Sequence, residues 1–237
     1  MKNRCFLLGG QDLEMVTIKK LLTQYGEKVI DLNLSWGAKL SDYKEYLDSK
    51  DTLYGIELEI DMEIPSNFIP IDHHNEQQHL PSSIQQIANI LNHQLSREEE
   101  LVSINDTQYI KGLQKYGATN IEITRIRNED RLAQGVSKEE ENAATLAMKN
   151  LKRVHSIVCH YFNYQHFSPL SDQLSLEHEK FVIYNNKITL FYGFDTSILI
   201  GNYPRKNIFY GGGNFGFFGI KENFNENQIS TILKGIE

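Results

Sequence analysis

Apolar and polar residues alternate in short blocks along the first half of the chain, and these blocks predict strands that take turns with helices. Runs rich in apolar and β-branched residues are typical of strands, and they cover residues 4–8, 28–32, 53–60 and 68–71. Apolar residues at helical spacing predict helices over 13–25, 43–47 and 82–91. This order predicts an α/β fold with a mostly parallel sheet flanked by helices.

The second half begins with helices and ends with strands. Serine-led capping boxes at 96–99 and 137–140 predict helix starts, and the second of these helices should end near residue 153. Further helices are expected over 107–115, 120–133 and 227–236, and strands over 154–161, 180–184 and 188–192. We therefore expect one domain over residues 1–153 and a smaller α+β domain over residues 154–237.

Composition indicates a folded protein without a membrane segment. The chain has 237 residues, of which 40% are hydrophobic, and this is enough to bury a core. Its first ten residues contain an apolar run of only four, too short for a signal peptide or a membrane span, so we expect a cytoplasmic protein. Cys5 and Cys159 lie in apolar strand-like segments and are expected to be buried free thiols.

A formal charge of −7 argues against a surface that binds long nucleic acid, because such binding uses many Lys and Arg contacts to phosphate. A small phosphate-bearing ligand remains compatible with this charge, since a metal ion can supply positive charge locally.

The residues that could bind a ligand or a metal ion lie where predicted strands end. Asp72, His73 and His74 directly follow the run 68–71, and ligands of open α/β sheets bind beyond the carboxyl ends of the strands. The other acids in such places are Asp12 and Glu14 after the first strand, Glu57, Glu59 and Asp61 along the third, and Asp106 before a predicted helix.

Each of these acids also has a purely structural explanation. Acids favour helix starts, an alternating acidic face can be the solvated side of an edge strand, and Asp106 can be an N-cap. If the strands form one parallel sheet, however, the acids and the imidazole meet at one edge. Carboxylate and imidazole groups suit Mn²⁺ or Mg²⁺, so the pattern predicts a site for one or two such ions.

The order of these segments resembles the DHH phosphoesterase superfamily. Its naming motif stands at Asp72-His73-His74, residues 82–91 are similar to its next segment, and Ile104-Asn-Asp-Thr107 is similar to its fourth motif. The resemblance implies a metal-dependent hydrolase. It also implies Asp12, Glu14, His73 and Asp106 as metal ligands, His74 as a phosphate contact and Asp72 beside it in the catalytic group. For the second-motif ligand, Asp61 matches by residue type while Glu57 lies deeper in the strand, and both stay open.

A glycine-rich run near the carboxyl end adds to the resemblance. Residues 210–220 read YGGGNFGFFGI and are similar to the substrate loop of the small domain often attached to such enzymes. Backbone N–H groups of glycines can approach a phosphate closely. This implies a substrate-binding role for Gly211, Gly212, Gly213 and Asn214.

The chain departs from the family pattern at three places. The family's first motif has a histidine where this chain offers Leu8 or Gly10, neither of which binds metal. Glu14 replaces an aspartate, and Asn214 replaces the histidine of the glycine loop. One metal site has therefore lost a ligand.

Arg127 and Arg131 share a face of the predicted helix 120–133 and could bind a phosphate, although ion pairing with acids is the more common role of such residues.

Our first hypothesis is a phosphoesterase that hydrolyses a small phosphorylated or nucleotide substrate with metal-activated water. The alternatives are a relative that binds a nucleotide or phosphate without hydrolysing it, and an interaction protein whose acids are only caps. The sequence leaves the oligomeric state open, a homodimer included.

Overall fold

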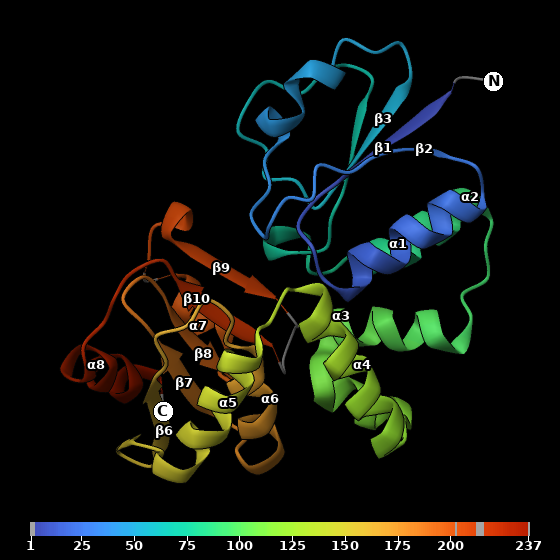
Figure 1. Cartoon of the computed structure of the whole chain (residues 1–237). Coiled ribbons are helices and arrows are strands. Elements are labelled where there is room, and N and C mark those ends of the chain that lie inside the picture. The colour runs from blue at the N-terminus through green and yellow to red at the C-terminus, as the bar shows by residue number, and fades with distance from the viewer. Residues whose placement is uncertain (1–2, 202, 212–215, 237) are drawn as a thin grey trace. The chain divides into compact units, whose positions relative to one another are not determined.

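The computed structural model describes residues 3–201, 203–211 and 216–236 (Figure 1). By contacts between residues, the chain divides into two compact units. The first runs up to Asp106 and also takes in Asn128–Gln134, and the second comprises Thr107–Arg127 and the residues from Gly135 onward. A domain boundary at residue 153 stays a prediction, and in this division the second unit begins further toward the amino terminus.

The first unit contains a four-stranded parallel sheet in the order β2-β1-β3-β4. The strands are β1 (Arg4–Leu8), β2 (Lys28–Ile30), β3 (Thr52–Ile56) and β4 (Phe68–Ile71). Leu8 pairs with Ile56, and Ile56 pairs with Ile71, so three strands end at the same level. The predicted parallel sheet is confirmed, and its carboxyl edge is well defined.

Apolar side chains cover both faces of this sheet. On one face, Phe6, Leu8 and Ile56 pack against α1 (Leu13–Gln24) and α2 (Ser83–Leu91). On the other face, Leu7 and Leu53 pack against the 3-10 helix η1 (Leu40–Tyr46). The predicted helices over 13–25 and 82–91 are confirmed, with Asp12 and Ser82 as their N-caps.

The third strand is shorter than the sequence predicted. β3 ends at Ile56, and Glu57 takes a left-handed backbone conformation with φ of 53°. This turn breaks the period of two, so the expectation that Glu57, Glu59 and Asp61 share one face of a strand is wrong.

Two helices contribute residues to both units, namely α3 (Arg97–Tyr116) and α4 (Asn120–Ala133). The capping box at 96–99 is confirmed, since the backbone N–H of Ser96 donates to Glu99 (2.7 Å) and that of Glu99 to Oγ of Ser96 (3.4 Å). Residues 97–116 are two helical segments that meet at a kink, where Tyr109 has non-helical angles (φ 58°, ψ −157°), so the predicted break at Thr107 lies two residues further along the chain. Asp106 is therefore a residue within a helix and not an N-cap.

The second unit contains a six-stranded mixed sheet in the order β5-β6-β7-β8-β10-β9, in which only β6 and β7 are parallel among the pairs described. Its strands are β5 (Arg153–Val154), β6 (Ile157–Tyr161), β7 (Phe181–Tyr184), β8 (Thr189–Tyr192), β9 (Ile208–Gly211) and β10 (Phe217–Ile220).

The remaining helices are α5 (Lys138–Ala147), α6 (Ser168–Glu177), α7 (Thr196–Ile200) and α8 (Glu226–Ile236), with short 3-10 helices η2 (Asn75–Gln77), η3 (Met148–Asn150) and η4 (Arg205–Asn207). α5 starts at the predicted capping box, but it ends at Ala147, before the predicted end near residue 153. Sequence reasoning did not predict α6, α7, β9 or β10.

Two further expectations concern the thiols and the membrane. Cys5 and Cys159 are buried and free, as predicted, and burial raises the pKa of both thiols. Within the described residues, every helix is too short or too polar to cross a membrane.

Candidate metal centre

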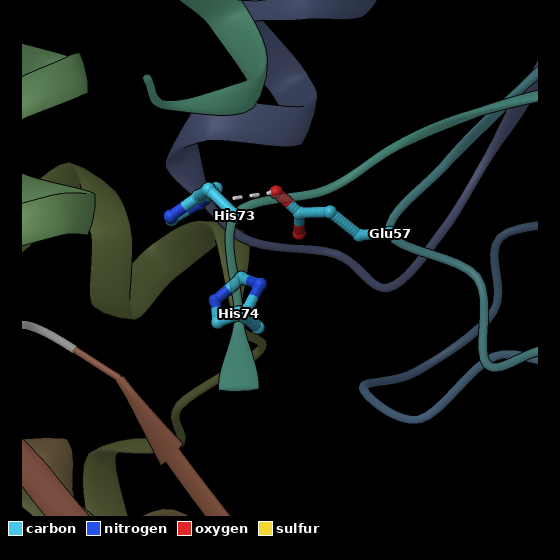
Figure 2. Close-up of side chains that lie close together, drawn as sticks. All are labelled: Glu57, His73 and His74. Atoms are coloured by element: carbon cyan, nitrogen blue, oxygen red, sulfur yellow. Dashed lines mark ion pairs between the residues drawn. The ribbon is translucent and has the colours of Figure 1, made fainter. Parts of the chain in front are cut away.

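The centre lies at the carboxyl edge of the first unit's parallel sheet. Glu57 directly follows β3, and Asp72 and His73 directly follow β4. Because Ile56 and Ile71 are paired, these residues leave the sheet at the same level. The left-handed conformation of Glu57 turns the chain there, and the Glu57 side chain reaches His73 (Figure 2).

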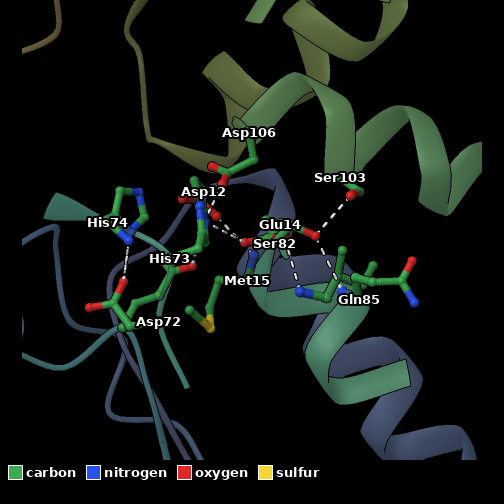
Figure 3. Close-up of polar contacts among 12 residues, drawn as sticks. Asp12, Glu14, Met15, Asp72, His73, His74, Ser82, Gln85, Ser103 and Asp106 are labelled. Carbon is green, nitrogen blue, oxygen red and sulfur yellow. Dashed lines mark hydrogen bonds and ion pairs between the residues drawn. The ribbon is translucent and has the colours of Figure 1, made fainter. Parts of the chain in front are cut away.

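Four side chains meet at this edge and surround one point. One oxygen each of Glu14, Glu57 and Asp106 and one ring nitrogen of His73 all lie within 4.8 Å of one another. The Nε2 atom of His73 is 2.6 Å from Oδ2 of Asp106, and 3.5 Å from both Oε2 of Glu14 and Oε1 of Glu57. Asp106 reaches this point from α3, on the opposite side from β4 (Figure 3).

These four atoms are buried and lack hydrogen-bond partners among the described residues. The short distances between them bring charges together without the direction that a hydrogen bond requires. Buried polar atoms in folded proteins nearly always have a partner, so four orphaned atoms at one point require an explanation. Three carboxylate oxygens and one imidazole nitrogen are a donor set that fits a divalent cation such as Mn²⁺.

The pKa values of the carboxyl groups at this edge shift in different directions. Burial, reinforced by the nearby Asp106, raises the pKa of Glu14 to about 8. Burial also raises the pKa of Asp12, again with help from neighbouring carboxylates. Burial opposes ionisation of Glu57 too, but His74 and His73 outweigh it and lower that pKa. Burial and Asp106 thus favour the neutral form of Glu14, whereas the imidazoles of His74 and His73 favour the ionised form of Glu57.

Hydrogen bonds from backbone and side chains hold the cluster in place. While Oε2 of Glu14 faces His73, its Oε1 accepts from the backbone N–H of Ile84 at the start of α2 (3.0 Å). Asp12 caps α1 by accepting from the N–H of Met15 (2.8 Å). Glu14 thus has one oxygen fixed by a helix terminus and the other directed at the centre.

His74 lies beside the cluster and has a different environment. Its ring lies 4.2 Å from that of His73, and its Nδ1 is 3.0 Å from Oδ1 of Asp72. Burial opposes protonation of His74, but Glu57 and the contact with Asp72 raise its pKa to about 9. With a side chain 25% exposed, His74 is a cation that a ligand can reach. Glu57, His73 and His74 also form a second possible metal-binding group, which shares two residues with the first.

The structure separates the two candidates for the second-motif ligand. Glu57 belongs to the cluster, whereas both oxygens of Asp61 accept hydrogen bonds from Ser41, from its backbone N–H (3.0 Å) and its hydroxyl (2.6 Å). Asp61 is exposed and its pKa is lowered, chiefly by the Ser41 hydroxyl. Of the predicted metal ligands, the structure brings together Glu14, Glu57, His73 and Asp106.

The predicted phosphate contacts at Arg127 and Arg131 have protein partners. The guanidinium of Arg127 donates to both oxygens of Asp172, at 3.1 and 2.8 Å, and lies 4.5 Å from the ring centre of Tyr109. Arg131 donates to the side chain of Asn128. Gly211 is buried at the end of β9, while Gly212, Gly213 and Asn214 lie outside the described residues.

One residue at this edge was missed from the sequence. Asp130 on α4 is buried, and its carboxylate accepts from the backbone N–H of Leu13 (3.1 Å) and from the side chain of Gln134 (3.0 Å). It fixes the start of α1 between Asp12 and Glu14. No local signal marks it, because its partner Leu13 is far away in the sequence.

Comparisons with known proteins return structures but no sequence relatives. No family model and no curated protein matches the chain. RecJ from Thermus thermophilus in complex with Mn²⁺ is 10% identical with a TM-score of 0.47, and the match covers 98% of this chain and 51% of RecJ. The pGpG-specific phosphodiesterase PggH from Vibrio cholerae is 11% identical with a TM-score of 0.46, and both chains are covered completely. The chain thus spans about half the length of Thermus RecJ.

A further structure, the exonuclease RecJ bound to manganese, is 10% identical with a TM-score of 0.43, and the match covers 99% of this chain and 89% of that one. The likeness concerns the fold alone. The function proposed below therefore rests on the side chains of this centre.

Proposed function

We propose that the chain is a metal-dependent phosphoesterase that hydrolyses a small phosphorylated or nucleotide substrate. The observation that carries the proposal is the meeting of four buried, orphaned donor atoms from Glu14, Glu57, His73 and Asp106 at the carboxyl edge of the sheet. Three carboxyl groups and one imidazole meet there in a site shielded from water. Burying charges in this way is costly unless a cation balances them.

The four side chains would hold a divalent ion, Mn²⁺ or Mg²⁺. When bound, such an ion polarises a phosphoryl oxygen and lowers the pKa of a water molecule. Glu14 and His73 are suited to hold it because their positions are fixed, the first by the N–H of Ile84 and the second by its place directly after β4.

His74 would bind the phosphate of the substrate. It is cationic at neutral pH, since its pKa is raised to about 9, and Asp72 orients its ring through Nδ1. The Nε2 N–H can then donate to an anionic phosphate oxygen, and charge-assisted hydrogen bonds of this kind are roughly twice as strong as neutral ones. Asp72 acts through His74, and its Oδ1 also accepts from the backbone N–H of His74 (2.8 Å).

A small substrate is supported by the charge of the chain. The net charge of −7 disfavours a long polyanion, whereas one phosphate can be neutralised by the ion and His74 together. PggH is described as pGpG-specific, which makes a dinucleotide a natural first substrate to assay.

The proposal is tested with bis(p-nitrophenyl) phosphate and a 5′-phosphorylated dinucleotide as substrates. We expect turnover that requires added Mn²⁺, stops with a chelator and is lost in Asp106→Asn. Asp61→Asn is the matched control, because it removes an acid of the same edge region that bonds Ser41 instead. Turnover unaffected by Asp106→Asn would refute the assignment. Binding of the dinucleotide without hydrolysis in Mn²⁺ would favour a non-hydrolysing nucleotide-binding protein.

A further inference from the structure

We infer that the centre holds a single divalent ion per chain, bound by Glu14, Glu57, His73 and Asp106. The inference rests on the proposed function, since it takes these four side chains as a metal site, and it adds how many ions that site can hold. In two-metal phosphoryl chemistry the two ions lie about 3.5–4 Å apart, so a second ion needs further donors of its own beside any carboxylate that bridges the pair.

The described side chains near the centre make one full donor set. A second group, Glu57, His73 and His74, shares two of its three residues with the first (Figure 2). Its third member, His74, already has its Nδ1 in contact with Asp72 at 3.0 Å. Since Glu57 and His73 are shared, Nε2 of His74 is the single donor that this group would give to a second ion alone.

The other acids of this edge have partners in the protein. Asp12 accepts from the N–H of Met15, and both oxygens of Asp61 accept from Ser41. Asp130 has its two oxygens on Leu13 and Gln134. A second ion bound by Oδ1 of Asp12, or by an oxygen of Asp61 or Asp130, would replace one of these hydrogen bonds, which for Asp12 is the cap of α1.

The end of β1 cannot supply a further ligand without rearrangement. Leu8 is 1% exposed and packs with Phe6 and Ile18 in the apolar cluster beneath α1, so a ligand at position 8 would point into this core. A Cβ atom on Gly9 would lie 2.5 Å from the carbonyl oxygen of Ile56. Neither position 8 nor position 9 can therefore present a metal ligand to the centre while the backbone stays in place.

The next two positions of this loop, Gly10 and Gln11, are also restricted by their neighbours. A Cβ atom on Gly10 would lie 2.7 Å from Cα and 2.8 Å from the backbone nitrogen of Trp36, which belongs to the loop after β2. Gln11 is exposed and donates to the side chain of Asn33 (3.0 Å). Real Cβ atoms do not come this close to backbone, so neither Gly9 nor Gly10 accepts a side chain while the two loops stay in place.

With one ion in place of two, the site has less metal charge to stabilise a phosphoryl group. One ion cannot clamp both the attacking and the leaving oxygen of a phosphoryl group. His74 can then contact the phosphate beside the ion, because its ring lies 4.2 Å from that of His73. This makes His74 more important to the reaction than an auxiliary phosphate contact.

The experiment is a Mn²⁺ titration of chelator-treated, desalted full-length protein by calorimetry, with metal content measured by plasma mass spectrometry after dialysis. We expect one Mn²⁺ per chain and an electron paramagnetic resonance spectrum of isolated ions. Two ions per chain with the spectrum of a coupled pair would overturn the single-ion inference and leave the phosphoesterase proposal standing. No bound Mn²⁺ would overturn both.

Two variants sharpen the result. Leu8→His offers the imidazole that the sequence lacks, and we expect it still to bind one Mn²⁺ and to have a lower melting temperature than wild type. Leu8→Ala is the matched control for the loss of packing around position 8. A gain from one ion to two in Leu8→His, with wild-type stability, would show that the end of β1 is open and would contradict the inference.

Discussion

The environment of Arg127 predicts that this residue stabilises the second unit and does not bind substrate. Its guanidinium forms a two-pronged pair with Asp172, and the side chains are only 7% and 9% exposed. The ring of Tyr109 stacks beneath the guanidinium, and the Tyr109 hydroxyl donates to Asp172. Because water is nearly excluded, solvent screens this pair little.

Replacing Arg127 by Met would keep much of the side-chain volume and leave the Asp172 carboxylate buried without its cation. Breaking a buried pair from one side costs ~3–5 kcal/mol. For a protein of this size each kcal/mol lowers the melting temperature by ~2–4 °C, so the expected drop is ~6–20 °C. Urea unfolding followed by circular dichroism measures the change in free energy, and Asp172→Asn should be destabilised similarly.

The control for Arg127→Met is Lys115→Met, which removes an exposed cation from the same unit and should change stability by less than ~0.5 kcal/mol. The double variant Arg127→Met/Asp172→Leu should lose less than the sum of its single variants, because no buried charge is left alone. The reasoning is refuted if Arg127→Met is as stable as Lys115→Met and instead weakens substrate binding.

Three further predictions concern the centre. The pKa of Glu14 is raised from 4.5 to about 8 on folding, so the folded metal-free protein keeps a proton that the unfolded chain releases. Its free energy of unfolding should therefore fall as pH rises from 4.5 to 8. Urea titrations should show that Mn²⁺ cancels this fall and that Glu14→Gln makes it smaller. Glu57→Gln should weaken Mn²⁺ binding at least ~10-fold by calorimetry, whereas Asp61→Asn should leave it unchanged, and equal effects would contradict the assignment. Asp130→Ala should cost ~1–3 kcal/mol in urea unfolding, because it leaves the buried N–H of Leu13 without its acceptor.

The local sequence pattern was sufficient to predict several strands and helices with their bounds. The apolar runs over 4–8 and 68–71 became strands with the predicted bounds, and 120–133 became a helix with the predicted bounds. The parallel arrangement followed from the alternation of elements, and it places Glu57 and His73 at the same edge of the sheet.

The sequence could not decide between Glu57 and Asp61, because apolar residues continue to alternate past the true end of β3. The strand stops there because the following segment pairs with another loop. The N–H of Glu59 donates to the carbonyl of Ala38 (2.8 Å), and the N–H of Leu40 donates to the carbonyl of Glu59 (2.9 Å). These contacts are non-local and leave no periodic signal.

The local sequence pattern also could not predict which residues the charged side chains contact. Arg127 and Asp172 are 45 residues apart, and Leu13 and Asp130 are 117 residues apart. Helical spacing placed Arg127 and Arg131 on one face, but only the tertiary structure shows that Asp172 neutralises the first of them.

The most direct test of the central claim is an anomalous difference map from a crystal of the protein soaked in Mn²⁺. The account predicts one strong peak among Oε2 of Glu14, Oε1 of Glu57, Nε2 of His73 and Oδ2 of Asp106, which are the atoms that lack hydrogen-bond partners. Absence of a peak at full soaking, with His73 hydrogen-bonded to the carboxylates instead, would contradict the claim that this cluster is a metal centre.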